Sequence, residues 1–329
     1  MNYKWNYQAP TEQKNAEADA LAQGTGFNPA LCHLLIDRGI RTVQEAKSFF
    51  RPSLLELHDP FLMDGMDAAI ARINKALGSE ERILIYGDYD VDGTTAVALM
   101  YTFLKRFNSH LEYYIPDRYD EGYGVSYKGI DWAVENGYTL IISLDCGIKA
   151  VEKVKYAAEK GIDFIICDHH LPDEVLPPAV AVLDPKREDC KYPFDDLSGC
   201  GVGFKLVQGY AQYKSIPFDE VTPLLDLVSV SIAADLVSVT GENRILAHYG
   251  LQRLNESPCK GLLSVIKLSG LENHKITIDD VVFKIGPRIN AAGRMESGRT
   301  AVDLLICRNE EDAKNIGVSI NEHNNERKS

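Results

Sequence analysis

The sequence predicts an α/β fold in which a mainly parallel sheet lies between layers of helices. Five short apolar runs have the length of buried strands; they occupy residues 83–86, 111–115, 140–144, 164–167 and 179–183. Longer stretches with helical spacing of apolar residues separate the first four runs; they occupy residues 94–107, 126–136 and 149–160. Because strands that alternate with helices build βαβ units, we expect a three-layer domain around this sheet.

Helices are predicted on both sides of this domain in the sequence. Apolar residues recur every three or four positions in the first 80 residues, at 31–38, 42–50 and 64–77. The same spacing returns after Gly201, at 202–213, 219–233, 245–255 and 260–268, before a Gly- and Pro-punctuated segment at 284–298. We therefore expect a helical N-terminal extension (1–80), the α/β domain with its helical second half (81–309), and a last helix (310–329).

Composition and charge exclude several classes of protein. The 329 residues are 45% hydrophobic and 25% charged, which is typical of a globular protein and excludes collagen, coiled coil and global disorder. No apolar run is long enough to span a membrane, and the first 20 residues lack a signal-peptide core. Seven cysteines without a CxxC pair predict free thiols and a cytoplasmic protein. The net charge of −13 argues against a protein that coats DNA, but it allows a local basic groove.

Acidic and histidine residues follow three of the predicted strands. The first strand runs into Asp88, Asp90 and Asp92, the third ends at Asp145, and the fourth ends in Asp168-His169-His170. A further aspartate, Asp235, lies in the apolar stretch SVSIAADLVSV. Since ligands bind at the carboxyl edge of an open α/β sheet, we expect these side chains to share one site.

Such a cluster requires positive charge. Two carboxylates 4 Å apart repel each other by about 4 kcal/mol at an effective dielectric constant of 20. Divalent cations remove this repulsion, and mixed Asp and His ligands suit Mn²⁺ or Mg²⁺. Two such ions can activate a water and stabilise the leaving oxygen of a phosphoester. The sequence therefore predicts two cations, Mn²⁺ or Mg²⁺, and phosphoester chemistry.

Two other interpretations of these residues are available. A single DxD sequence is ordinarily a turn with solvated carboxylates. Clusters of such residues at the ends of three strands are not explained by one turn. The residues 90–94 (DVDGT) also match the nucleophile loop of haloacid-dehalogenase-like phosphatases, in which the first aspartate attacks phosphorus. That family needs a later acidic pair, which we do not find downstream of the sheet, and its chemistry leaves Asp145 and the two histidines unused.

The motifs GDYDVDGTTA, SLDCG, CDHH and the Asp235 segment, in this order, resemble the four motifs of the DHH phosphoesterase superfamily. Within it, three stretches resemble the RecJ-like single-strand-specific 5′→3′ exonucleases; they are residues 57–73, 115–126 (IPDRYDEGYGVS) and 286–295 (GPRINAAGRM). The resemblance implies a DHH domain and, after a connecting helix, a further DHH-associated domain. We therefore expect the chain to be an N-terminal catalytic fragment that ends within this connecting helix.

The resemblance assigns roles to individual residues. It implies metal ligation by Asp90, Asp92, Asp145, His169 and Asp235, with Asp145 as the bridge between two ions. Many relatives carry a histidine where this chain has Tyr86, and Asp88 takes that ligand's place here. His170 is implied to contact the scissile phosphate or the leaving oxygen, and Asp168 to orient the histidines.

Two segments carry the residues expected to bind nucleic acid. Residues 284–299 hold four basic side chains (Lys284, Arg288, Arg294 and Arg299) and one acidic side chain, together with Asn290 and small residues that let a backbone approach phosphates. Arginines can hold phosphate oxygens in bidentate fashion. In the other segment, Arg118 is expected to hold a terminal 5′-phosphate while an aromatic ring such as Tyr123 stacks on a base.

The function implied is metal-dependent hydrolysis of single-stranded DNA from its 5′ end to 5′-mononucleotides, in repair and recombination. We expect a monomer with a single-strand-binding protein and a helicase as partners. One alternative is another DHH hydrolase that acts on short oligonucleotides, cyclic dinucleotides or pyrophosphate. A more distant alternative is a DHH-fold binding module without activity, which the full set of acidic residues disfavours.

Overall fold

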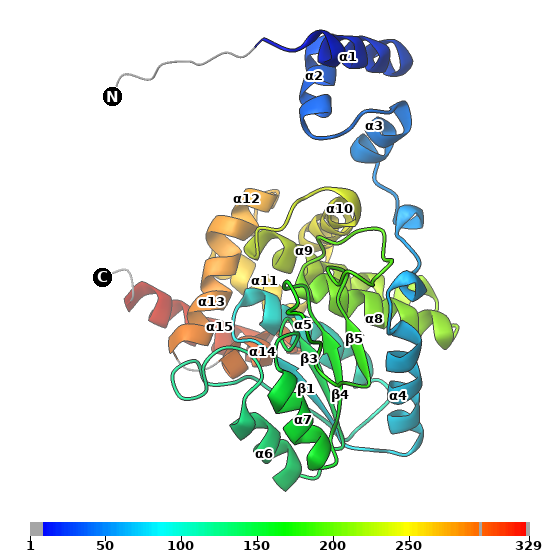
Figure 1. Cartoon of the computed structure of the whole chain (residues 1–329). Helices are drawn as coiled ribbons and strands as arrows, with labels where there is room; N and C mark the ends of the chain where they lie inside the picture. Colours follow the sequence, from blue (N-terminus) through cyan, green and yellow to red (C-terminus); the bar gives the residue numbers. More distant parts are fainter. Residues whose placement is uncertain (1–8, 296–297, 327–329) are drawn as a thin grey trace. The chain divides into compact units, whose positions relative to one another are not determined.

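The larger part of the chain is built on a five-stranded parallel sheet with strand order β2-β1-β3-β4-β5 (Figure 1). The computed structural model describes the backbone of residues 9–295 and 298–326 and the side chains of residues 9–291 and 298–318. The strands are β1 (Ile83–Gly87), β2 (Leu111–Tyr114), β3 (Leu140–Leu144), β4 (Asp163–Cys167) and β5 (Ala181–Leu183). The predicted parallel sheet is confirmed, and each strand lies within two residues of its predicted bounds.

The register of the sheet aligns the carboxyl ends of four strands. Gly87 pairs with Leu144, Leu144 with Cys167, and Cys167 with Leu183. The residues that follow these four are all aspartates: Asp88, Asp145, Asp168 and Asp184. A row of carboxylates therefore crosses one edge of the sheet.

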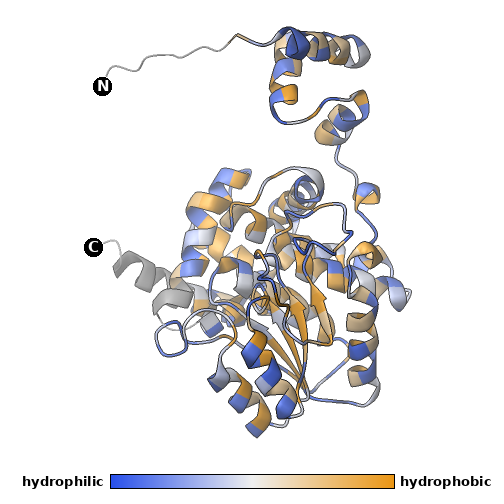
Figure 2. Cartoon of the chain, in the orientation of Figure 1, coloured by the Kyte–Doolittle hydropathy of each residue, from blue (hydrophilic) through white to orange (hydrophobic). Residues whose placement is uncertain are grey.

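Helices cover both faces of the sheet, which is why its strands are nearly continuous apolar runs. On one face, α6 (Tyr127–Glu135) and α7 (Val151–Glu159) pack through residues such as Ile130 and Val154. On the other face lie α5 (Val91–Leu104) and α8 (Gly199–Tyr213). The strands are the most apolar part of the chain, and polar residues gather on the outward faces of the helices (Figure 2). This arrangement is the expected three-layer α/β fold.

Helices also form the second half of the larger unit. The further helices of this unit include α4 (Met66–Gly78), α9 (Leu225–Ala234), α10 (Gly241–Glu256), α11 (Lys260–Leu268), α12 (Ile278–Asp280), a π-helix (Val281–Ile285), α13 (Gly286–Met295), α14 (Gly298–Leu305) and α15 (Glu310–Glu326). α9 packs against α5, α8 and α10, and α13 packs against α9 and α5. In the described part of the chain, no helix has the length and hydropathy that a bilayer span requires.

A smaller unit precedes the sheet, because the chain divides between Glu56 and Leu57. It holds α1 (Glu12–Thr25), α2 (Pro29–Asp37) and α3 (Val43–Phe50) around a core that includes Leu21, Leu35 and Ala46. α3 begins with a capping box: the side chain of Thr42 accepts a hydrogen bond from the amide of Glu45, and the Glu45 carboxylate accepts one from the amide of Thr42. The helices expected in this region are present.

Two segments differ from the sequence pattern. α5 begins at Val91, three residues earlier than the apolar spacing indicates, because Asp90 caps its N-terminus by accepting a hydrogen bond from the amide of Gly93. The Gly- and Pro-punctuated segment at 284–298 is helical over most of its length, since it continues from the π-helix into α13. Proline is tolerated there because Pro287 occupies the first turn of α13.

A buried ion pair ties the second half of the larger unit to the segment before α4. Lys205 of α8 is fully buried, and its Nζ lies 2.7 Å from the carbonyl oxygen of His58 and 3.1 Å from Glu242 Oε1. Glu242 also accepts hydrogen bonds from the amide of His58 and the hydroxyl of Tyr192. Every charge in this cluster is thus compensated, so removal of one partner leaves a buried group unpaired.

Replacement of this lysine should therefore destabilise the protein. We expect Lys205→Ala to lower the free energy of unfolding by about 3 kcal/mol, because it leaves Glu242 buried without its cation. The exposed ion pair of Lys155 with Glu152 offers a control, and Lys155→Ala should cost less than about 1 kcal/mol. Urea unfolding followed by circular dichroism measures both; similar losses for the two variants would contradict this role of the buried pair.

Candidate metal centre

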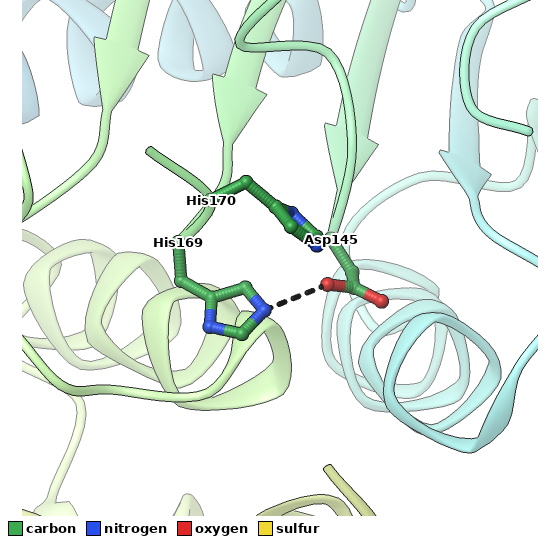
Figure 3. Close-up of side chains that lie close together, drawn as sticks. All are labelled: Asp145, His169 and His170. Atoms are coloured by element: carbon green, nitrogen blue, oxygen red, sulfur yellow. Dashed lines mark ion pairs between the residues drawn. The ribbon is translucent and has the colours of Figure 1, made fainter. Parts of the chain in front are cut away.

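The aspartates and histidines predicted at the strand ends meet at one site. Three groups of side chains bring ligand atoms within 4.8 Å of one another. They are Asp88, Asp90 and Asp145; Asp92, His169 and Asp235; and Asp145, His169 and His170. Figure 3 shows the third group, in which His169 points toward Asp145 and His170 lies beside them.

The loop from β1 into α5 positions three of the carboxylates. Asp88 is fully buried directly after the strand, and Asp90 caps the helix. A side chain at Gly93 would place its Cβ 2.5 Å from the carbonyl oxygen of Asp88, so the tight turn requires glycine. Glycine at the end of the DxDG sequence thus lets the first turn of α5 pack closely against the backbone of Asp88.

Asp92 is oriented by the N-terminus of α8. Its Oδ2 accepts a hydrogen bond from the amide of Gly199 at 2.7 Å, and its Oδ1 accepts from the amide of Cys200 at 2.8 Å. Ser231 Oγ lies 2.7 Å from the same Oδ1. Amides at a helix N-terminus have no partner within the helix and carry partial positive charge, so they favour a carboxylate at this position.

Asp145 sits at the most constrained position of the site. Its backbone has φ 58°, a left-handed conformation that is uncommon outside glycine. A side chain at Gly199 would place its Cβ 2.6 Å from the Cβ of Asp145, so α8 can approach only because this residue is glycine. The buried Asp145 Oδ1 has no hydrogen-bond partner among the described residues, although His169 Nε2 lies 3.2 Å away.

His169 lies among three carboxylates. Its Nε2 is 3.2 Å from Asp145 Oδ1, 3.6 Å from Asp235 Oδ2 and 3.7 Å from Asp92 Oδ2. Neither ring nitrogen makes a hydrogen bond within the described structure, and burial lowers the pKa of this imidazole. A neutral histidine keeps a lone pair free for a metal ion.

Burial and mutual repulsion raise the pKa values of several carboxylates at this edge. Burial, followed by the charge of Asp90, raises the pKa of Asp88 to about 7. Burial and the charges of Asp92 and Asp90 raise the pKa of Asp235 to about 7 and hold that of Asp145 well above its usual range. These raised pKa values, and the unpartnered oxygen atoms of the buried Asp88 and Asp145 side chains, fit divalent cations, which prefer such oxygen ligands.

The comparisons with known proteins agree with this geometry. The model of the DHH family, N-terminal domain, matches residues 82–232, which span the sheet, α8 and most of α9. The resemblance to the DHH phosphoesterases is thus confirmed over these residues. The haloacid-dehalogenase-like interpretation is therefore wrong. Asp145 and both histidines lie in the same cluster of side chains as the aspartates of the DxD loop, as the DHH motifs predict.

Several bacterial relatives of this chain carry the same name. The single-stranded-DNA-specific exonuclease RecJ of Bacillus subtilis is 39% identical over 324 residues, which are 98% of this chain and 40% of the relative. RecJ of Escherichia coli is 33% identical over 312 residues, 91% of this chain and 53% of the relative. The chain thus spans about half the length of the curated relatives it matches. A crystal structure of exonuclease RecJ bound to manganese matches with a TM-score of 0.75 and 29% identity, over 84% of this chain and 68% of that one.

The second histidine of the DHH motif has a different environment from the first. His170 Nδ1 lies 2.7 Å from Asp168 Oδ1, and its Nε2 lies 3.1 Å from the hydroxyl of Tyr123. The hydrogen bond to Asp168 raises the pKa of His170, so this imidazole is favoured as a cation. Burial opposes ionisation of Asp168, but hydrogen bonds from His170 and from the amide of Ile148 lower its pKa. The contact between Asp168 and His170 therefore favours the charged form of both side chains.

The residues predicted to bind nucleic acid lie on two segments. Arg118 is exposed, and its guanidinium lies over the ring of Tyr89, 5.2 Å from its centroid. Tyr89 packs edge-on against Tyr123, which in turn contacts His170. A row of side chains thus leads from Arg118 to the candidate metal ligands around His170.

The second segment is α13. Arg288 donates to the carbonyl oxygen of Lys284, and its buried Nε has no partner among the described residues. Asn290 is half-buried on the same helix, and the side chain of Arg294 lies outside the described residues. α13 packs against α5 and α9, whose ends carry Asp90, Asp92 and Asp235.

Several residues of the site were not predicted from the sequence. Ser198, Gly199 and Ser231 position Asp92 and Asp145, and Asp184 adds a fourth aspartate at the strand ends. Asp184 is fully buried, its Oδ2 has no partner among the described residues, and burial raises its pKa to about 7. Its position directly after the fifth predicted strand was the available signal. The glycine-rich start of α8 (SGCGVG) was the corresponding signal for a helix N-terminus at the site.

The raised pKa of Asp88 predicts how stability depends on pH. Between about pH 4 and pH 7 the folded protein retains a proton that the unfolded chain has lost, so the stability of the metal-free protein falls as pH rises through this window. Because asparagine does not titrate, Asp88→Asn should gain stability relative to the wild type across the window, by at most about 4 kcal/mol.

Thermal unfolding at a series of pH values, with a chelator present, measures this difference. With saturating Mn²⁺ the wild type should be the more stable of the two, because it binds the ion through the Asp88 carboxylate, which the variant lacks. Asp219→Asn, at an exposed position, controls for the loss of one carboxylate. A difference between Asp88→Asn and wild type that stays constant from pH 4 to pH 8 would contradict the electrostatic account.

Proposed function

We propose that this chain is the catalytic part of a metal-dependent exonuclease that degrades single-stranded DNA from its 5′ end and releases 5′-mononucleotides. The observation that carries the proposal is the set of three ligand groups at one sheet edge, with buried ligand atoms that lack partners among the described residues. The relatives at 39% and 33% identity are named single-stranded-DNA-specific exonucleases, which supports this substrate. A role in DNA repair and recombination follows from such an activity.

Two divalent cations, Mn²⁺ or Mg²⁺, fit the residues present. Asp88, Asp90 and Asp145 would hold one ion, and Asp92, His169 and Asp235 the other, with Asp145 between them. Divalent cations in such a pair supply Lewis acidity toward a phosphodiester and acidify water. The match to a RecJ crystal structure bound to manganese supports this assignment.

The chain's own side chains supply proton transfer and orientation. His170, favoured as a cation by Asp168, faces the metal edge and can donate a hydrogen bond to the scissile phosphate or a proton to the leaving oxygen. Asp168 accepts from the amides of His169, His170 and Ile148, so its own position is fixed. A fixed base partner is what keeps an imidazole in one orientation during turnover.

Binding of the strand is assigned to the two basic segments. Arg288, Asn290 and Arg294 of α13 would contact phosphates of the strand, and Arg118 would hold its terminal 5′-phosphate. Tyr123, which is 53% exposed, offers a ring on which a base can stack. In a chain with a net charge of −13, such local basic groups decide where a nucleic acid can bind.

The organisation and surroundings of the chain are further parts of the proposal. We propose a helical extension at 1–80, the DHH domain at 81–309, and the start of a connecting helix at 310–329; the family match at 82–232 lies within the second of these. All seven cysteines are free thiols, which supports a cytoplasmic site of action. A single-strand-binding protein and a helicase are the proposed partners of a monomeric enzyme.

The proposal predicts a defined digest and its loss in a metal-ligand variant. Wild-type protein with Mn²⁺ should release mononucleotides from 5′-labelled single-stranded DNA, and much less from duplex or RNA; a chelator should stop the reaction. Asp145→Ala should lower the rate more than tenfold, equivalent to about 1.4 kcal/mol, because both ions lose a shared ligand. Asp219→Ala, at an exposed position, is the control.

Other outcomes of the same digest would replace the proposal. Activity confined to di- or trinucleotides or cyclic dinucleotides would identify a different DHH hydrolase. Asp145→Ala with more than a tenth of the wild-type rate would contradict the two-metal centre. No hydrolysis of any of these substrates by the wild type would favour a binding module.

A separate prediction concerns the affinity for single-stranded DNA. Arg288→Ala should weaken binding of single-stranded DNA and lower the slope of log affinity against log salt by roughly 0.7, because one phosphate contact is lost. Binding of Mn²⁺ should not change. Lys75→Ala, on α4 and away from the strands' carboxyl ends, is the charge-matched control. Fluorescence anisotropy at several salt concentrations measures both variants, and an unchanged slope for Arg288→Ala would remove α13 from the binding surface.

A further inference from the structure

A network of hydrogen bonds lies beneath the loop that carries Arg118 and Tyr123, and none of the roles assigned so far uses it. The loop connects β2 with α6 over residues 115–126. Both Arg118 and Tyr123 are exposed side chains on this loop. Such side chains hold a ligand group at one place only if the loop beneath them is itself fixed. The groups that fix the loop therefore bear on how a strand is held.

Glu121 joins the two ends of the loop. Its carboxylate accepts hydrogen bonds from the amide of Asp117 at 2.9 Å and from the hydroxyl of Tyr114 at 3.0 Å. It also accepts one from the hydroxyl of Ser126, the N-cap residue of α6. The three donors come from the end of β2, the start of the loop and the end of the loop. One carboxylate thus closes the loop on itself.

The turn that contains Arg118 is fixed by its neighbours in the chain. The carboxylate of Asp117 accepts hydrogen bonds from the amides of Tyr119 at 2.8 Å and Asp120 at 2.9 Å. The amide of Glu121 donates to the carbonyl oxygen of Asp117 at 2.9 Å. The backbone on both sides of Arg118 is therefore held, while its side chain stays exposed.

The same hydrogen bonds keep the guanidinium of Arg118 available to a ligand. Three acidic side chains lie within three residues of it, and each could neutralise its charge. Asp117 and Glu121 instead accept hydrogen bonds from backbone amides, and Asp120 lies 4.0 Å from Lys128. Arg118 forms no ion pair with any described residue. Its charge can therefore be used to hold a phosphate group.

Tyr86 connects this loop to the strand that leads into the metal centre. It is fully buried in β1, two residues before Asp88. Its hydroxyl donates to the carbonyl oxygen of Gly124 at 3.1 Å and accepts from the amide of Ser126 at 3.1 Å. Gly124 directly follows Tyr123. One hydrogen-bonded frame thus includes the start of the metal-ligand segment and the loop that faces it.

We propose that Tyr86 and Glu121 are positioning residues that hold Arg118 at a fixed place relative to the metal ligands, and so set a preference for strands with a 5′-phosphate. The assignment rests on the proposed function, in which Arg118 holds the terminal 5′-phosphate. Tyr86 is fully buried and the carboxylate of Glu121 is engaged by three donors, so both act through the loop. A loop ordered in advance spares the strand the cost of ordering it on binding.

Two oligothymidylates that differ only in a 5′-phosphate or a 5′-hydroxyl test this role, with the whole chain and Mn²⁺. The wild type should have the higher kcat/KM for the phosphorylated strand. Tyr86→Phe keeps the buried ring and removes only the hydroxyl. It should lower the ratio of the two kcat/KM values by at least about fivefold, the factor that one lost hydrogen bond commonly costs. Glu121→Gln should lower it similarly, because an amide group has fewer acceptor sites than a carboxylate.

Two matched variants control for charge and for packing. Asp120→Asn removes the same charge from the same loop, at a side chain that is 75% exposed. Tyr138→Phe removes a hydroxyl from another buried tyrosine of the same core, outside this network. Both should keep the ratio within about twofold of the wild type, since neither breaks a hydrogen bond of the loop. Equal losses on the two strands in Tyr86→Phe and Glu121→Gln would indicate general damage and overturn the proposal.

Binding without hydrolysis separates this proposal from the proposed function. Fluorescence anisotropy with a chelator present should show tighter binding of the phosphorylated strand by the wild type, and Tyr86→Phe should lose that difference. Equal digestion of both strands by the wild type would overturn the positioning role and leave the exonuclease in place. A phosphate-dependent affinity that Tyr86→Phe loses, in a protein that digests neither strand, would support the positioning role and overturn the proposed function.

Discussion

Repulsion between carboxylates at one edge of the sheet is the constraint on which the rest of the structure depends. Asp88, Asp90, Asp92, Asp145 and Asp235 come together within two ligand groups, which the third group links through Asp145 and His169. Each pair at about 4 Å costs on the order of 4 kcal/mol at an effective dielectric constant of 20. The fold holds them there through a rigid scaffold. Four parallel strands end in register, and glycines at 93 and 199 let neighbouring backbones approach where any side chain would collide.

The carboxylates at this edge fall into two kinds: some accept hydrogen bonds from the protein and position their neighbours, and others keep lone pairs available for cations. Asp92 and Asp168 receive hydrogen bonds from backbone amides, and Asp168 also binds His170. Asp88 and Asp145 are similarly buried, yet neither carboxylate oxygen of Asp88, nor Asp145 Oδ1, has a hydrogen-bond partner among the described residues. Carboxylates of the first kind are satisfied by protein and hold their neighbours in place. Those of the second kind retain free lone pairs, which only a proton or a cation can satisfy.

Local patterns predicted much of this arrangement, and long-range contacts account for what they missed. Continuous apolar runs identify strands buried on both faces, and the residues after each strand must lie at one edge. The helix that positions Asp92 could not be inferred in this way, because Gly199 lies 107 residues further along the chain. The same holds for Ser231, 139 residues from its partner, and for the left-handed backbone of Asp145, which no sequence pattern around it requires. The start of α5 was misplaced for a local reason: Asp90 has two uses, as a helix cap and as a candidate ligand.

If the proposed function is correct, charge also links cation binding to substrate binding. Five carboxylates at the centre present five negative charges near neutral pH once their protons are displaced, and two divalent cations return four positive charges. A phosphodiester is therefore repelled from the empty centre and only weakly opposed by the loaded one. The remaining attraction must come from groups around the centre, which are the arginines of α13 and Arg118. Because the rest of the chain is strongly acidic, a strand gains contact energy only where these groups surround the bound cations, and so binding away from the metal edge is disfavoured.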